Sequence, residues 1–120
     1  GWFARMRAAF AVLAESTGFH RGWIGQATDD AELVTLTTLW EGIGAYRKAL
    51  SRFAVKAEVI PLLSTAIDEP TAYEAVVVQE AGEVKSFASG LAADHDAVGL
   101  GSASAAFVPP VTGADVHDGR

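Results

Sequence analysis

The chain contains no cysteine. It therefore has no disulfide framework, no thiolate nucleophile and no metal site built on cysteine ligands. Also missing is any apolar run near the roughly 20 residues that a membrane-spanning helix needs. The N-terminal stretch carries Arg5 and Arg7 within its apolar face, which is unlike the apolar region of a secretory signal. From these absences we expect a soluble cytoplasmic protein with no membrane partner.

Basic residues are scarce, with 9 Lys and Arg against 15 Asp and Glu and a net charge of −6. The imbalance is uneven, because residues 1–60 hold seven basic and six acidic side chains and residues 61–120 hold two and nine. A nucleic-acid-binding domain concentrates Lys and Arg on one face or stripe. No such concentration is present in this sequence, so the composition argues against a nucleic-acid partner.

Signals for metals and nucleotide cofactors are absent as well. The three histidines, His20, His95 and His117, have no companions at the spacing of a metal site. The short strings GIG and GLG do not follow the strand-turn-helix pattern of a dinucleotide-binding loop. We therefore expect no metal, NAD, flavin or ATP site, and any reaction must draw its reducing power from the substrate.

The chain does have enough apolar residues for one compact domain, since 50% of its 120 residues are hydrophobic, many of them alanine. Helical spacing and strand-forming residues predict five segments. They are a helix at 2–14, strands at 19–26 and 32–40, a helical region at 43–66 and a final strand at 72–78. The acidic turn between the first two strands makes them a hairpin.

Three residues mark where the predicted helices begin and end. Gly18 suits a left-handed cap after the first helix. Ser51 is a candidate N-cap inside the helical region. Pro61 would break or kink an interior turn, so the second part of that region is expected to be short.

Beyond residue 80 the pattern dissolves into Ala, Gly and Ser, which predicts a weakly ordered, flexible tail. We therefore divide the chain into a domain at 1–80 and an acidic tail at 81–120. The predicted order α-β-β-α-β matches a ferredoxin-like β-α-β-β-α-β unit, an α+β fold, without its first strand. One interpretation is that the sequence is truncated at its N-terminus. The alternative is that a tail segment near 83–88 takes the missing strand position.

Four strings together resemble a known family: GFHRGWIGQATDD, LVTLTTLW ending on Trp40, EGIGAYRKAL, and DEPTAYE. Over residues 2–78 the chain is similar to the antibiotic-biosynthesis-monooxygenase-like group of dimeric α+β barrel proteins. The resemblance implies a homodimer whose two sheets pack face to face, with a cleft between sheet and helices in each subunit. A sheet with helices on one face also needs cover on the other, which favours dimerisation independently.

Candidate site residues lie where the second strand passes into the helix. Trp40 could stack on a planar aromatic substrate or donate its indole N–H, and the alternative is a core plug between strand and helix. Tyr46, six positions later, is the first candidate for catalysis through its phenol. The competing interpretation is a half-buried tyrosine with its hydroxyl in water.

The first strand adds three further candidates. His20 is the second catalytic candidate, although a lone strand histidine is more often structural. Arg21 and Trp23 share one face of that strand and are candidates for substrate binding.

Two main functions remain open from the sequence, and a purely structural interaction through the tail is a third option. The first is a small cofactor-independent monooxygenase, an oxidoreductase acting on a phenol, anthrone or polyketide-like aromatic. The second is a non-catalytic dimeric barrel that binds a small hydrophobic ligand or serves as an assembly module. The scarcity of acid-base residues favours the non-catalytic barrel. The absence of metal and nucleotide motifs is compatible with both functions.

Overall fold

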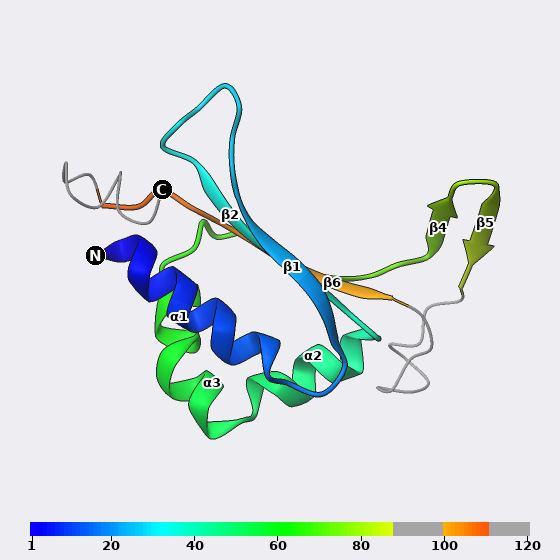
Figure 1. Cartoon of the computed structure of the whole chain (residues 1–120), viewed down its shortest axis with the longest axis horizontal. Coiled ribbons are helices and arrows are strands. Elements are labelled where there is room, and N and C mark those ends of the chain that lie inside the picture. The colour runs from blue at the N-terminus through cyan, green and yellow to red at the C-terminus, as the bar shows by residue number, and fades with distance from the viewer. Residues whose placement is uncertain (88–99, 111–120) are drawn as a thin grey trace.

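The computed structural model describes residues 1–87 and 100–110. It is an α+β fold in which helices lie on one face of an antiparallel sheet (Figure 1). The elements are α1 (Trp2–Ala14), β1 (Phe19–Gln26), β2 (Val34–Trp40), α2 (Ile43–Leu50), α3 (Phe53–Glu58), α4 (Ile60–Leu63), β3 (Ala72–Glu74), β4 (Val77–Glu80), β5 (Glu83–Ser86) and β6 (Gly101–Phe107).

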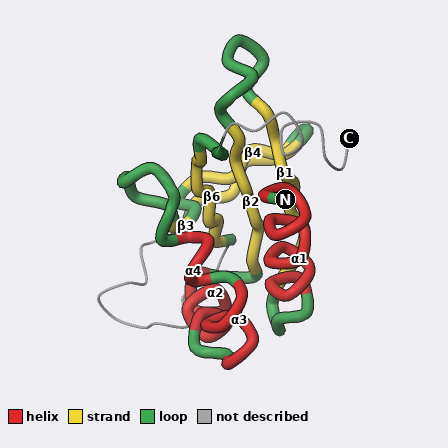
Figure 2. The backbone as a smooth tube through the Cα atoms, turned by 90° about the vertical axis from the view of Figure 1, so that its left-hand side faces the viewer, coloured by secondary structure: helices red, strands yellow, loops and turns green. Residues whose placement is uncertain are grey.

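The main sheet has the strand order β1-β2-β6-β3, and every neighbouring pair is antiparallel. Its strands run side by side in Figure 2. β1 and β2 form the predicted hairpin, and in its turn the Glu32 amide donates to the Asp30 carboxylate at 3.1 Å. The predicted first helix and first hairpin are thus confirmed.

β6 is the main departure from the sequence prediction. Residues 81–120 were expected to form a weakly ordered tail, and this is wrong for 101–107, which lie in the middle of the sheet. Residues 88–99 and 111–120 of that segment fall outside the described residues. The strand alternates buried and half-buried positions, but most of its side chains are Ala and Ser. Such small side chains give little hydrophobic contrast, so its strand character comes from pairing on both edges.

The predicted final strand at 72–78 is in fact two strands. β3 pairs with β6, and this pairing ends with the bond from the Ala75 amide to the Leu100 carbonyl at 2.7 Å. The following residues pair with β5 to make a separate two-stranded sheet. A tail segment does enter the main sheet, but it is β6 rather than the suggested segment near 83–88, most of which belongs to β5.

The helical region between β2 and β3 is broken into three short helices. Pro61 lies in the first turn of α4, where a missing N–H costs nothing, so it begins a helix instead of kinking one. Ser51 is not an N-cap. It ends α2, and its hydroxyl donates to the Lys48 carbonyl at 2.6 Å. The cap position of α3 belongs to Arg52.

The core lies between the helices and one face of the sheet. Alternate residues of β2 and of β6 point into it, among them Trp40 and Phe107. Trp2 on α1 contacts Phe107 with ring centroids 5.6 Å apart, so the first helix is tied to the end of the last strand. Arg52 links α3 to α1 by donating to the Val12 carbonyl at 3.1 Å.

Two glycines permit close approaches that position α2. Gly18 has the expected left-handed conformation, with a φ of +87°, but it does not cap α1, whose C-cap is Glu15. A Cβ at Gly18 would lie 2.6 Å from the Ala45 Cβ. At Gly101, the first residue of β6, an added Cβ would lie 2.7 Å from the Ile43 nitrogen. Both contacts press the start of α2 against the end of the sheet.

Candidate functional site

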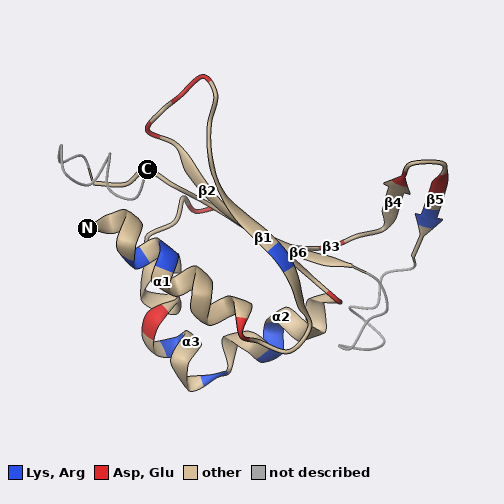
Figure 3. Cartoon of the chain, in the orientation of Figure 1, with Lys and Arg blue, Asp and Glu red and all other residues tan. Residues whose placement is uncertain are grey.

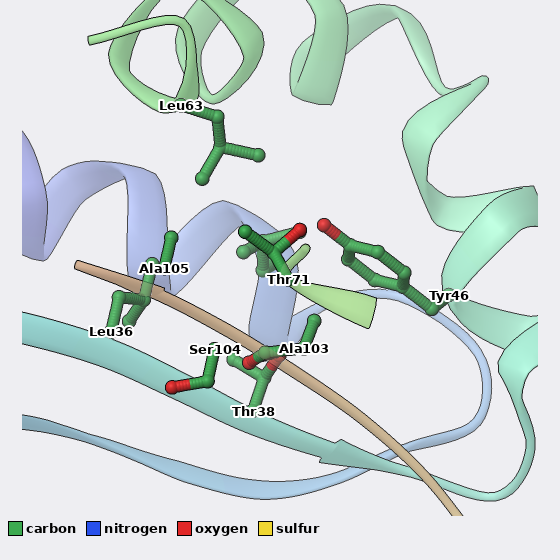
Figure 4. Close-up of a pocket in the computed structure, with 9 residues that line it drawn as sticks. Leu36, Thr38, Tyr46, Leu63, Thr71, Ala103, Ser104 and Ala105 are labelled. Atoms are coloured by element: carbon green, nitrogen blue, oxygen red, sulfur yellow. Dashed lines mark hydrogen bonds between the residues drawn. The ribbon is translucent and has the colours of Figure 1, made fainter. Parts of the chain in front are cut away.

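A small cleft lies between the core side of the sheet and the helices (Figure 4). Its lining comes from almost every layer of the fold: Leu13, Leu36, Thr38, Tyr46, Leu63, Thr71, Ala103, Ser104 and Ala105. Most of the side chains that point into it are apolar. The Ser104 side chain is on the other face of the sheet, where its hydroxyl lies 2.9 Å from that of Thr37. The enclosed space is close to that of a single water molecule.

Tyr46 supplies the titratable group of this cleft. It sits on α2 with only 6% of its surface exposed, so the interpretation of a half-buried tyrosine with its hydroxyl in water is wrong. Figure 4 shows its hydroxyl and that of Thr71 pointing toward one another. Burial raises the pKa of the Tyr46 phenol. At neutral pH this side chain is therefore a hydrogen-bond donor and not a phenolate base.

Trp40 lies beside Tyr46 but not in the cleft. Its side chain is fully buried and is not among the lining residues. The indole N–H donates to the Thr38 hydroxyl at 2.8 Å, so it is not available to a ligand. Its ring packs 5.4 Å from the ring of Tyr46 and 5.3 Å from that of Phe19. The core-plug alternative describes this position, and Trp40 orients Tyr46 by packing.

Thr38 is a cleft residue that the sequence analysis missed. It is 1% exposed, and its hydroxyl accepts from Trp40 and donates to the Ala103 carbonyl at 3.3 Å. The available signal was a polar residue at a core position of the two-residue alternation in β2. Thr71 and the β6 residues gave no such signal, because only the fold brings them to Tyr46.

His20, Arg21 and Trp23 are not brought together with Tyr46. His20 is exposed and lies at the irregularity in the β1-β2 register between Phe19 and Arg21. Arg21 and Trp23 are on the face of the sheet opposite the helices, where the guanidinium carbon is 5.9 Å from the Trp23 ring. The candidates on β1 therefore belong to a different surface from the cleft.

We call this second surface the open sheet face. It consists of Arg21 and Trp23 from β1, Thr35, Thr37 and Leu39 from β2, Tyr73 from β3, and Ser102, Ser104 and Ala106 from β6. No described helix covers it (Figures 1 and 2). Trp23 is 44% and Tyr73 53% exposed, and the Thr37 and Ser104 hydroxyls are 2.9 Å apart.

The open sheet face has very little charge. Arg21 is its one charged residue. Figure 3 shows the other charged residues mainly on the helices, the turns and the β4-β5 hairpin. A depletion of charge around exposed aromatic side chains is typical of the central part of a protein interface.

Among residues 1–87 and 100–110, no cluster of three or more His, Asp or Glu side chains is arranged to hold a metal ion. Within the same residues, no helix combines the length and apolar character needed to cross a membrane. The chain matches no protein-family model, no curated protein and no solved structure. The resemblance to the monooxygenase-like barrels therefore stays a prediction.

Proposed function

We propose that the protein is a ferredoxin-like subunit of a homodimeric α+β barrel of the antibiotic-biosynthesis-monooxygenase-like kind. The strand order supports this proposal. β6 lies between β2 and β3 and is antiparallel to both, which is the position of the first strand in a β-α-β-β-α-β unit. The uncovered, nearly uncharged open sheet face supplies a surface for the second sheet of the barrel.

In this barrel the cleft at Tyr46 binds a small, mainly apolar molecule that carries one hydroxyl or carbonyl oxygen. One observation carries this conclusion. The hydroxyls of Tyr46 and Thr71 face each other in a cleft whose other walls are largely aliphatic. Small-molecule sites combine such apolar walls with a few placed polar groups. The cleft as it stands holds about one water molecule, so a larger ligand requires side chains of the lining to move.

A second candidate function is cofactor-independent oxygenation of a phenol or anthrone in the same cleft. It is favoured by the position of the buried Tyr46 hydroxyl in the cleft, because a protonated phenol can hydrogen-bond the anionic oxygen of an activated substrate. With an anthrone, the substrate methylene becomes a carbonyl. One atom of dioxygen enters the product and the other leaves as water, so no external reductant is needed. Tyr46 acts here as a donor, whereas His20 is not among the residues that line the cleft.

Both functions are tested with the full chain and a panel of anthrones, naphthols and hydroquinones. Binding is followed by calorimetry and turnover by oxygen uptake without added cofactor. We expect Tyr46→Phe and Thr71→Val each to weaken binding about tenfold, the loss of one hydrogen bond to a ligand oxygen. His20→Gln is the matched control outside the cleft and should bind as the wild type does.

The outcomes separate the two candidates. Binding without oxygen uptake supports the ligand-binding function alone. Oxygen uptake that survives His20→Gln and is lost in Tyr46→Phe supports the oxygenase. If no compound binds, or if Tyr46→Phe and Thr71→Val bind as tightly as the wild type, the cleft is not the ligand site.

A further inference from the structure

The β4-β5 hairpin, residues 77–86, is separate from the main sheet, and we call it the arm. Figure 1 shows it projecting from the end of the sheet, away from the helices. Gly82, with a φ of +80°, forms its turn, and the Phe87 amide closes its base by donating to the Val76 carbonyl at 2.9 Å. An isolated two-stranded hairpin is only marginally stable in water, so this one needs support from another surface.

The register of the arm sorts its side chains by charge. Val77, Gln79, Val84 and Ser86 share one face, which carries no charge. Val78, Glu80, Glu83 and Lys85 share the other, where Lys85 and Glu80 form an ion pair at 3.5 Å. A strand alternates in this way when one face is covered and the other meets water. On the uncharged face, however, Val77 is 60% and Val84 57% exposed.

The uncharged face of the arm lies close in the chain to the open sheet face. The arm follows β3, whose Tyr73 belongs to the open sheet face, and only Ala75 and Val76 separate the two strands. In a twofold dimer each contact is made twice, so an arm that reaches the partner is matched by the partner's arm. Surfaces without charge meet there without repulsion. Glu80 and Glu83 on the opposite face oppose contact with nucleic acid or an anionic membrane.

We propose that the arm clasps a second copy of this chain, laying its uncharged face along the edge of that copy's open sheet face. This inference rests on the proposed dimer and adds a second contact to it. The charged face of the arm stays in water. Each subunit gives one arm and receives one, so the two arms close the interface symmetrically.

The test places an aspartate on each of the two faces of the arm in the full chain. Sedimentation velocity over a range of concentrations gives the dimer dissociation constant. We expect Val84→Asp to raise this constant at least roughly tenfold, because it buries a carboxylate in the contact. Glu83→Asp, at an exposed position of the charged face, should change it less than about threefold.

Hydrogen exchange of the wild type gives a second measurement that needs no variant. The amides of residues 77–86 should become more protected as the concentration rises through the dissociation constant. A wild type that stays monomeric would overturn the dimer and the arm together. A dimer that is unaffected by Val84→Asp, or whose arm exchanges equally fast at all concentrations, would overturn the arm alone and leave the dimer standing. Ligand binding at Tyr46 is independent of all these outcomes.

Discussion

Trp40 and Tyr46 are neighbours in space, yet their polar atoms have opposite surroundings. The indole N–H of Trp40 is occupied by Thr38 within the core, whereas the Tyr46 hydroxyl faces the cleft. A buried indole donor without a partner would be costly, so the Thr38 hydroxyl is what allows a tryptophan at this strand end. Trp40 therefore packs within the core, and Tyr46 presents its hydroxyl to the cleft.

The raised pKa of Tyr46 predicts how stability changes at alkaline pH. The folded state holds this proton more tightly than the unfolded chain, so the free energy of unfolding falls as pH rises past about 10 toward the folded pKa. Below that range the proton is bound in both states and has no effect. Urea unfolding of Tyr46→Phe at increasing pH should show a shallower fall than the wild type.

Unfolding of both proteins at neutral pH supplies the control for this titration. The Tyr46 phenol holds its proton there in the folded and the unfolded state, so any difference between the two proteins reflects the lost hydroxyl alone. Equal slopes for Tyr46→Phe and the wild type would show that the Tyr46 phenol ionises as easily in the folded as in the unfolded protein.

Among the elements, β6 shows most clearly that a strand can form where no sequence pattern predicts one. Its core side chains are Gly101, Ala103, Ala105 and Phe107, so only the last has bulk. Small side chains are required there, because Gly101 touches the start of α2 and the alanines lie beneath the helices at the cleft. Pairing with β2 along its full length and with β3 over part of it holds the strand in place.

Phe107 is the anchor of β6, and its removal should cost far more than the composition of the strand suggests. Phe107→Ala leaves a cavity beside Trp2 and should lower the free energy of unfolding by about 3–5 kcal/mol. Val108→Ala, at a neighbouring residue that is 57% exposed, should stay within about 0.5 kcal/mol of the wild type. Denaturant unfolding measures both. A loss below about 1 kcal/mol for Phe107→Ala would mean that β6 is not part of the cooperative unit.

The elements that the sequence predicted well are those with strong periodicity. In α1 the buried residues Trp2, Met6, Ala9 and Leu13 recur every three or four positions. In β2 the buried positions alternate through Trp40. The break of 72–78 into β3 and β4 had no comparable signal, since it depends on where backbone pairing with β6 ends.

At the scale of the whole molecule, the described fold is two layers with one face of the sheet left open. Trp23 lies near the middle of β1 on that face, and its exposure is explained if a second sheet covers it. The core has no comparable gap, since the cleft at Tyr46 holds little more than a water molecule. The open sheet face, and not the core, is therefore the surface on which the proposed dimer depends.

Trp23→Lys should disrupt the proposed dimer, because two lysines and two Arg21 side chains would then meet in a surface that excludes water. Sedimentation or light scattering should report a monomer at concentrations where the wild type is dimeric. Phe53→Lys is the control, since Phe53 is 86% exposed on α3, on the helical side of the sheet. A Trp23→Lys protein that dimerises as the wild type does would rule out the open sheet face as the interface.

The sequence by itself determined the first helix, the β1-β2 hairpin, the helical region and the presence of Trp40 and Tyr46 at the strand-helix junction. These elements show helical or strand spacing among residues that are close together in the sequence, so the sequence alone predicts them. Only the tertiary structure decided that β6 completes the sheet, that Trp40 is a plug, and that Thr38 and Thr71 join Tyr46. Each of these depends on contacts between residues far apart in the chain, for which a local pattern carries no signal.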